Sequence, residues 1–190
     1  MAIFLSHSTA AECWKSGRFD ALPIYKPEIE CASREEIRAL QLEKLKETVA
    51  EIKAAGGEAS YIVTDVAKKD DVFAMAKFAI DTYGRIDVLV NNAGTMPLAF
   101  FSEHEQALDK WEQCIDISIK GTIFGISAVY DQMIKQGQGQ VINVSSIYAN
   151  FPVAGAGVYQ VAKMGVQYLA ESLRSECQGK IKVTTIKPTG

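Results

Sequence analysis

Residues 140–163 read QVINVSSIYANFPVAGAGVYQVAK, and this stretch decides the fold. Its first part, 140–144, is a short apolar run with β-branched side chains, which predicts a buried strand. A loop with Phe151, Pro152 and two glycines follows, and a long helix at about 158–176 comes next, with apolar residues on several sides. A strand that leads into a helix is the repeating unit of a parallel sheet.

The same alternation of helix and strand extends outward from this stretch. A capping box at Ser33 and the glycine pair that begins at Gly56 bound one expected helix, which carries an apolar stripe at helical spacing. Further helices are expected at 70–83 and about 109–136, and further strands at 61–64, 86–90 and 182–186. This order predicts an α/β fold, a doubly wound parallel sheet with helices on both faces.

The composition is that of one globular domain. The chain has 190 residues, of which 48% are hydrophobic and 23% charged, and this excludes disorder as the main state. The net charge of −3 argues against binding to nucleic acid, and no apolar run has the ~20 residues that a membrane span needs. We therefore expect an α/β domain at 33–190, preceded by a segment, 1–32, that lacks clear periodicity.

The cysteines and histidines indicate no metal site. The chain has four cysteines and two histidines, and their spacings are wide and irregular. Residues 1–10 have no basic region and too short an apolar stretch for a signal peptide. We expect a cytoplasmic protein whose cysteines are free and mostly serve packing.

The pair Tyr159 and Lys163 is the first candidate for chemistry. Four residues apart on a helix, the two side chains share a face. An ammonium beside a phenol favours the phenolate, and such a tyrosine can exchange a proton with a carbonyl or alcohol oxygen. The alternative is a chance pair on a helix surface.

Polar residues also follow the expected strands, where open parallel sheets bind ligands. Ser145 and Ser146 could hydrogen-bond a substrate oxygen that gains charge, or simply form a turn. The turn at 91–94, Asn-Asn-Ala-Gly, could let a planar ligand approach the backbone, or be an asparagine-rich turn. Asp65 could accept a hydrogen bond from an adenine amino group, or be the N-cap of the following helix.

Taken together these residues resemble the short-chain dehydrogenase/reductase family. The matching motifs are Thr64-Asp65-Val66, Asn91-Asn92-Ala93-Gly94, Ile142-Asn143-Val144-Ser145-Ser146 and Tyr159-Gln160-Val161-Ala162-Lys163, in family order and at family-like spacings over about residues 42–190. Tyr159 stands thirteen positions after Ser146, and this spacing identifies Ser146, rather than Ser145, with the family's serine.

The resemblance implies a Rossmann-like fold that binds NADP or NAD and moves a hydride between the nicotinamide and a ketone or secondary alcohol. It implies that Tyr159 is the general acid/base, that Lys163 lowers its pKa and holds the nicotinamide ribose, and that Ser146 polarises the carbonyl. It also implies a cofactor surface formed by Asp65, Val66, Asn91, Asn92, Ala93, Gly94, Tyr159, Lys163 and Pro188. Arg34 or Arg38 could meet a 2′-phosphate, or each could be a solvated charge on the helix. Between the two cofactors we slightly favour NADP.

Three features depart from the family's pattern. The glycine-rich phosphate loop is not recognisable in 1–32, where Ser6-His7-Ser8-Thr9 stands at about its place. Ser118 replaces an asparagine that helps to hold a water in the family's proton relay. The chain ends at Pro188-Thr189-Gly190, inside the expected fold. The sequence therefore indicates an incomplete fold, from a fused or truncated reading frame, or a diverged relative.

Two functional hypotheses follow. The first is an NAD(P)-dependent oxidoreductase that acts on a small carbonyl or alcohol substrate through Ser146, Tyr159 and Lys163, with Ser118 in a supporting role. The second is a pseudoenzyme that serves as an interaction or oligomerisation module. In either case we expect a homodimer or homotetramer, paired through the two long helices, because each has apolar residues on more than one side.

Overall fold

The computed structural model describes residues 34–189, and the side chains from Leu42 onward. The described chain divides into two compact units, and the boundary along the chain falls between Val63 and Thr64. The first unit holds helix α2 (Arg34–Ala54) and the segment that follows it, and the second holds the sheet with its helices. The expected boundary between 1–32 and 33–190 falls at the edge of the described residues and stays a prediction.

Helix α2 confirms the expected amphipathic helix. Leu42, Leu45, Val49 and Ile52 are half-buried along one stripe, whereas the charged residues between them are exposed. The helix ends at a glycine in the left-handed conformation, Gly56, with φ of 82°. The expected capping serine, Ser33, lies outside the described residues.

The prediction of a strand at 61–64 is wrong. This segment is irregular and does not pair with any strand of the described sheet. Its apolar side chains are more than a third exposed: Tyr61 and Ile62 at 37%, and Val63 at 52%. The composition favours a strand, but strand structure is completed by a partner strand rather than by local preference.

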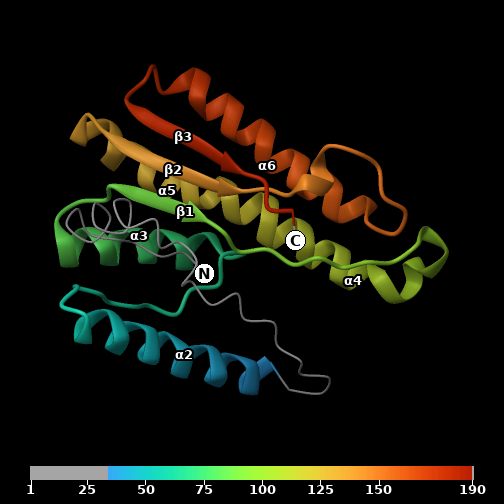
Figure 1. The fold of residues 1–190 in the computed structure, drawn as a ribbon, viewed down its shortest axis with the longest axis horizontal. Coiled ribbons are helices and arrows are strands. Elements are labelled where there is room, and N and C mark those ends of the chain that lie inside the picture. Colours follow the sequence, from blue (N-terminus) through green and yellow to red (C-terminus); the bar gives the residue numbers. More distant parts are fainter. Residues whose placement is uncertain (1–33, 190) are drawn as a thin grey trace. The chain divides into compact units, whose positions relative to one another are not determined.

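Three parallel strands form the sheet of the second unit (Figure 1). They are β1 (Val88–Asn91), β2 (Gly139–Val144) and β3 (Ile181–Ile186), in the order β1-β2-β3. The register pairs Leu89 with Val141 and Val141 with Val183, so these apolar side chains form a row on one face. The strands expected at 86–90, 140–144 and 182–186 and their parallel arrangement are confirmed, as is the Rossmann-like class.

Three helices bury that row. They are α3 (Lys69–Tyr83), α5 (Gly121–Gln136) and α6 (Gly157–Glu176). One core cluster joins residues of all three helices to the strands: Ala76, Ala79, Ile86, Leu89, Val129, Met133, Val141, Leu173, Cys177 and Ile181. The two crossovers, through α5 and α6, run in the same direction across the sheet, so the right-handed rule places both helices on one face. Helices on the second face stay a prediction.

The long helical segment expected at about 109–136 begins earlier and is interrupted. It consists of α4 (His104–Ile115), a π-helical turn η2 (Asp116–Lys120) and α5, which follow one another without a break in the chain. Single π-helical turns inside α-helices are rare and occur frequently at functional sites. This one contains Ser118, whose side chain is buried.

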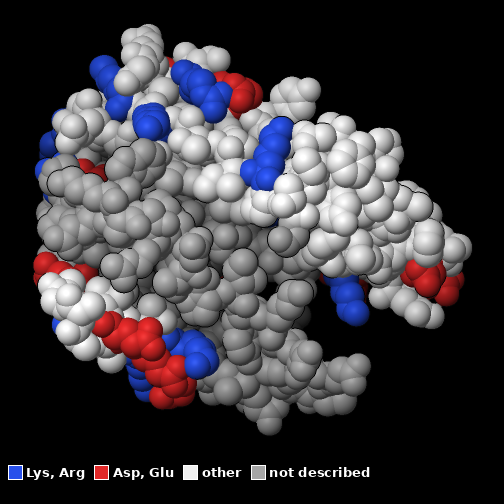
Figure 2. Space-filling view, in the orientation of Figure 1, with Lys and Arg blue, Asp and Glu red and all other residues white. Residues whose placement is uncertain are grey.

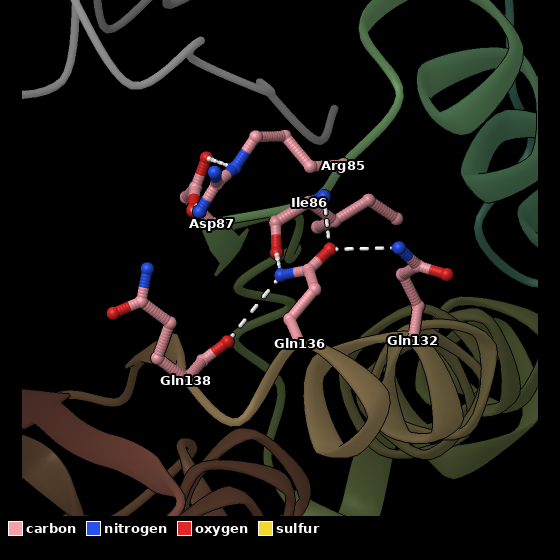
Figure 3. A network of polar contacts seen from close by, with 6 residues as sticks. All are labelled: Arg85, Ile86, Asp87, Gln132, Gln136 and Gln138. Carbon is pink, nitrogen blue, oxygen red and sulfur yellow. Dashed lines mark hydrogen bonds and ion pairs between the residues drawn. The ribbon is translucent and has the colours of Figure 1, made fainter.

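A glutamine network fastens the end of α5 to the entrance of β1 (Figure 3). The amide of Gln136 accepts a hydrogen bond from Ile86 N at 2.9 Å and donates one to Ile86 O at 2.7 Å. Arg85 pairs with Asp87 beside it, at 2.6 Å. Because this network lies at the amino end of the strands, it leaves the carboxyl end free for chemistry. None of the helices within 34–189 is both long and apolar enough to cross a bilayer.

Candidate active site

The carboxyl edge of the sheet gathers most of the expected catalytic residues. Strand β2 ends at Val144, and the serines Ser145 and Ser146 follow at once. Helix α6 brings Tyr159 and Lys163 to the same edge, since Lys163 bonds to Val144. The three proposed catalytic side chains are nearly inaccessible to water, with Ser146 6%, Tyr159 9% and Lys163 5% exposed.

The ammonium of Lys163 occupies a defined place. Its Nζ donates a hydrogen bond to the carbonyl oxygen of Val144 at 2.8 Å and lies 5.9 Å from the centroid of the Tyr159 ring. Burial lowers the pKa of Lys163 below its ordinary value of 10.5, and the charge of a nearby Cys114 thiolate opposes this in part. A lysine with one carbonyl partner and little water is a strong local source of positive field.

The two serines have different surroundings. Ser145 Oγ donates to the carbonyl oxygen of Lys163 at 2.8 Å and accepts from Gln167 Nε2 at 3.0 Å. Ser146 Oγ accepts from Tyr148 N at 3.2 Å and so caps the short helix η3 (Ile147–Ala149). This bond leaves the hydroxyl proton of Ser146 available, because a serine can accept and donate at once. Ser146 can therefore cap the turn and still donate a hydrogen bond to a substrate oxygen, so the two alternatives considered for it are compatible.

Ser118 lies beside the lysine. Its side chain is 1% exposed, and its Oγ has no hydrogen-bond partner within the described part of the chain. A Cβ added at Gly94 would stand 3.1 Å from Lys163 Nζ and 3.6 Å from Ser118 Oγ. A side chain at position 94 would therefore crowd the space next to both polar groups, which glycine keeps open. The buried, unsatisfied hydroxyl indicates that a further polar partner, such as water, belongs there.

Cys114 is a neighbour that the sequence patterns did not single out. Its side chain is fully buried in a small cluster with Tyr159 and Ala162, and its Sγ donates to the carbonyl oxygen of Thr95 at 3.4 Å. Burial raises the pKa of the Cys114 thiol above its ordinary value, and Thr95, the neighbouring Ser118 side chain and the Lys163 charge oppose this in that order. The thiol serves packing, as expected for the cysteines in general.

Asp65 stands in a turn rather than at a helix cap. Its Oδ1 accepts from Ala67 N at 3.1 Å, and its own N–H donates to Asp71 Oδ2 at 3.1 Å. The N-cap of α3 is Lys68, so the capping alternative for Asp65 is wrong. The local bonds form an Asx-turn, a motif that a strand-to-helix connection commonly uses.

Val66 and the 91–94 turn lie together. A shallow pocket joins Val66 and residues 91–93 with Ile117 and Gly121. A Cβ at Gly121 would stand 3.2 Å from Val66 Cγ2, so the two elements are in close contact. The structure thus brings Val66, one of the two expected adenine residues, next to the expected turn. Pro188 lies near the serine loop, because its carbonyl oxygen accepts from Ile147 N at 3.1 Å.

Asn91 turns its side chain toward the sheet and α5. Its Nδ2 donates to Asn143 Oδ1 at 2.8 Å, and the two residues are register partners on β1 and β2. A Cβ at Gly125 would stand 2.4 Å from Asn91 Oδ1, so the amide lies directly against the α5 backbone. Asn143 belongs to one of the sequence motifs but was given no role there, and Gly125 was not singled out by the sequence patterns. The available signals were a polar residue inside an apolar strand and a glycine inside a helix.

The surroundings of the site are uncharged. Residues 91–102 and 140–162 contain no Asp, Glu, Lys or Arg, and the described surface at the right of Figure 2 carries few charged side chains. The two segments meet, since Ala99 N donates to the carbonyl oxygen of Gly155 at 2.9 Å. Within residues 34–189 no cluster of His, Cys, Asp or Glu could hold a metal ion. The arrangement can donate and accept protons at an oxygen held near Ser146 and Tyr159.

The groups at this edge fit a nicotinamide cofactor as far as the structure describes them. The Gly94 backbone comes close to the Lys163 ammonium and the Ser118 hydroxyl, and Val66 lines a small pocket together with Asn91, Asn92 and Ala93. The expected phosphate segment, Ser6–Thr9, lies outside the described residues. Of the expected site residues, Gly94 lies against Lys163 and Ser118, and the Lys163 ammonium lies near the Tyr159 ring. Ser146 stands two residues after Val144, whose carbonyl oxygen Lys163 contacts.

Comparison with known proteins agrees with these motifs. A family model described as short chain dehydrogenase matches residues 36–190. An uncharacterized oxidoreductase of Staphylococcus saprophyticus is 41% identical over 128 residues, which are 66% of this chain and 51% of the relative. The chain therefore spans about half the length of that curated relative.

Two solved structures are also similar. A metagenomic short-chain oxidoreductase in complex with NADP has a TM-score of 0.72 and 32% identity, over 78% of this chain and 67% of the other. A short-chain dehydrogenase/reductase from Burkholderia phymatum in complex with NAD has a TM-score of 0.73 and 25% identity, over 78% of this chain and 53% of the other. Both the fold and the family thus have independent support.

Proposed function

The chain belongs to the short-chain dehydrogenase family, and we propose that it is an NAD(P)-dependent oxidoreductase that interconverts a ketone and a secondary alcohol. The observation that carries this proposal is the environment of Lys163, a buried ammonium held at 2.8 Å from Val144 O and beside the Tyr159 ring. Such a placement is costly for a lysine, so it indicates a purpose in chemistry rather than in stability.

Each residue of the site has a distinct part in this proposal. When bound, the nicotinamide supplies or receives the hydride. Tyr159 donates its phenolic proton to the substrate oxygen in reduction and takes a proton from the alcohol in oxidation. The ammonium of Lys163 places a positive charge beside the Tyr159 ring and holds the nicotinamide ribose in this proposal. Ser146 donates its free hydroxyl proton to the same substrate oxygen as charge develops there.

The cofactor lies along the carboxyl edge in this proposal. Lys163 and Gly94 meet the nicotinamide ribose, whereas Asp65 and Val66 meet the adenine, with Asn91–Ala93 and Pro188 between or beside them. The close approach of the Gly94 backbone to Lys163 and the contact between Val66 and Gly121 support this layout. We favour NADP over NAD because of Arg34 and Arg38, whose side chains lie outside those described. The unsatisfied Ser118 hydroxyl holds a water next to Lys163 in this scheme, in a proton relay.

Tyrosine substitutions on α6 test the proposal. Tyr159→Phe removes the proton donor and little volume, so we expect ketone reduction to fall at least ~100-fold while the fold is kept. Tyr168→Phe is the matched control, because Tyr168 stands on the same helix and is 73% exposed. The assay follows NADPH and NADH absorbance with a panel of ketones at high cofactor concentration. Substantial activity in Tyr159→Phe would contradict the assignment.

A second candidate function is an interaction module without turnover. It is favoured by the residues before Gly56, which include one glycine, Gly17, where a phosphate loop would need several. A protein of this kind would keep its fold and association but show no cofactor-dependent reaction. The same absorbance assay separates the two candidates.

We further propose that two copies associate through α4, α5 and α6. The exposed apolar side chains on these helices include Leu108 at 51%, Val161 at 59% and Tyr168 at 73%. An open groove of about 850 Å³ lies between α4 and α6, lined by Phe101, Trp111 and Val158 among others. An apolar surface of this kind favours a symmetric contact. Sedimentation of Val161→Lys tests the proposed association, with Lys110→Ala on the exposed surface of α4 as the control. Loss of the dimer only in Val161→Lys supports the contact. A monomeric wild type overturns it.

The substrate in this proposal is a small carbonyl or alcohol compound. A cytoplasmic location is proposed on the cysteines, since Cys114 and Cys177 are both free and buried.

A further inference from the structure

We propose that Ser145 and Gln167 form a positioning pair that fixes Lys163 against the carboxyl end of β2. The inference rests on the role proposed above for Lys163, and it gives the first serine of the pair a task different from that of Ser146. Neither residue touches the reacting atoms in this scheme. Both act through the lysine.

Lys163 is held at both ends by two consecutive residues of one strand end. Its carbonyl oxygen accepts a hydrogen bond from Ser145 Oγ at 2.8 Å, and its Nζ donates one to Val144 O at 2.8 Å. A lysine side chain has four rotatable bonds, so its ammonium is ordinarily mobile. Because its two ends are tied to adjacent residues, the ammonium has little freedom to leave the space between Tyr159 and Gly94.

The Ser145 hydroxyl has a fixed direction. Gln167 Nε2 donates to Ser145 Oγ at 3.0 Å, so the hydroxyl acts as acceptor on that side. Its single proton is then directed to the Lys163 carbonyl. The backbone of Ser145 is also held, because its N–H donates to Ile186 O on β3 at 2.8 Å. Ser145 therefore joins β2, β3 and α6 at the point where the ammonium must be placed.

The burial of these groups makes the pair sensitive to substitution. Ser145 is 2% exposed and Lys163 is 5% exposed, so water does not readily replace a lost bond. A serine on the same helix offers a contrast: Ser175 Oγ also donates to a helix carbonyl, Glu171 O, at 3.1 Å, but on the exposed surface. The same chemical bond is thus present in two settings, of which one lies beside the proposed catalytic lysine.

The experiment compares Ser145→Ala and Gln167→Met with Ser175→Ala in the full chain. The first readout is the side-chain carbon resonance of Lys163, labelled at Cε, identified by its loss in Lys163→Met and followed through a pH titration without cofactor. The titratable side chains next to this ammonium are Cys114 and Tyr159, and all three variants keep both. We expect both Ser145→Ala and Gln167→Met to move the Lys163 resonance and raise its titration midpoint toward that of a solvated lysine. Ser175→Ala should leave both unchanged.

The second readout is steady-state kinetics with a ketone substrate. Loss of one anchoring bond should lower kcat about 5- to 10-fold with little change in KM for the ketone. If Ser145→Ala and Gln167→Met alter the Lys163 resonance no more than Ser175→Ala does, the positioning pair is overturned. If the resonance moves as expected but wild type reduces no ketone, the positioning is supported and the proposed function fails.

Discussion

Replacing Gly125 by alanine should destabilise the protein, against the ordinary preference of helices for alanine. In the interior of an exposed helix this change stabilises by about 0.5–1 kcal/mol. Here the new Cβ would stand 2.4 Å from Asn91 Oδ1 and 3.5 Å from Leu89 Cδ2. The first distance is far below any van der Waals contact, so the Asn91 amide has to move.

That movement breaks a buried hydrogen bond. Asn91 Nδ2 donates to Asn143 Oδ1 at 2.8 Å, and Asn143 is fully buried with its Nδ2 already unpartnered within the described residues. Leaving the Asn143 oxygen unsatisfied costs about 1–3 kcal/mol, and overpacking costs about 1–3 kcal/mol more. After the helix preference is subtracted, the free energy of unfolding should fall by about 3 kcal/mol. The midpoint of thermal unfolding should fall by about 6–12 °C.

Urea and thermal unfolding followed by Trp111 fluorescence provide the assay, in a Trp14→Phe background so that one tryptophan reports. Gly165→Ala is the control, because its Cβ would meet the flexible end of Ile119 at 3.3 Å rather than a buried amide. That variant should be unchanged or slightly more stable. In an Asn91→Ala background, Gly125→Ala should become stabilising, since the amide is gone. A Gly125→Ala protein as stable as wild type would refute the reasoning.

Two further predictions concern charge and the cofactor. Burial lowers the pKa of Lys163 below 10.5, so between the lowered pKa and 10.5 the unfolded chain holds more protons than the folded one, and the free energy of unfolding rises with pH. Lys163→Met should remove this rise, which is measured from the urea midpoints at about pH 7 and about pH 9.5. Midpoints that change equally between these pH values in wild type and Lys163→Met would contradict the prediction. The chain should bind NADPH and NADH with dissociation constants near the millimolar range. The reason is that Ser6–Thr9 carry a β-carbon at each step of the expected phosphate segment, so several charge-assisted hydrogen bonds to phosphate, of about 1.5–3 kcal/mol each, are lost. Micromolar affinity for either cofactor in calorimetry would contradict this and would show that the segment binds phosphate.

The helices and the described strands were largely predictable from local pattern. Helix α3 was expected at 70–83 and begins one residue earlier, and α6 was expected at 158–176 and does the same. In α3 the regular apolar spacing indicates which face is buried, whereas α6 has apolar residues on several sides and its buried face is known only from the structure. The prediction of a strand at 61–64 failed because strand structure depends on how neighbouring segments are arranged, which the composition of one segment does not specify.

The site was predictable in its residues but not in its supports. Tyr159, Lys163 and Ser146 form motifs at fixed spacing, whereas the bond from Ser145 to the Lys163 carbonyl joins residues 18 apart and depends on how α6 crosses β2. The same holds for Asn91 and Gly125, since the close approach of a helix backbone to a sheet amide is a property of packing. The π-helical turn at 116–120 had no sequence signal that periodicity could detect.

Transfer of deuterium tests the central claim most directly. The chain is incubated with NADPH or NADH deuterated at the transferring position of the nicotinamide, at concentrations high enough to fill a weak site, together with a panel of ketones, and the alcohols are analysed by mass spectrometry. The account predicts deuterium at the carbinol carbon of at least one alcohol with wild type and Tyr168→Phe, and its near absence with Tyr159→Phe. No deuterium in any alcohol, at cofactor concentrations at which binding is measured, would contradict the claim that this chain is an oxidoreductase.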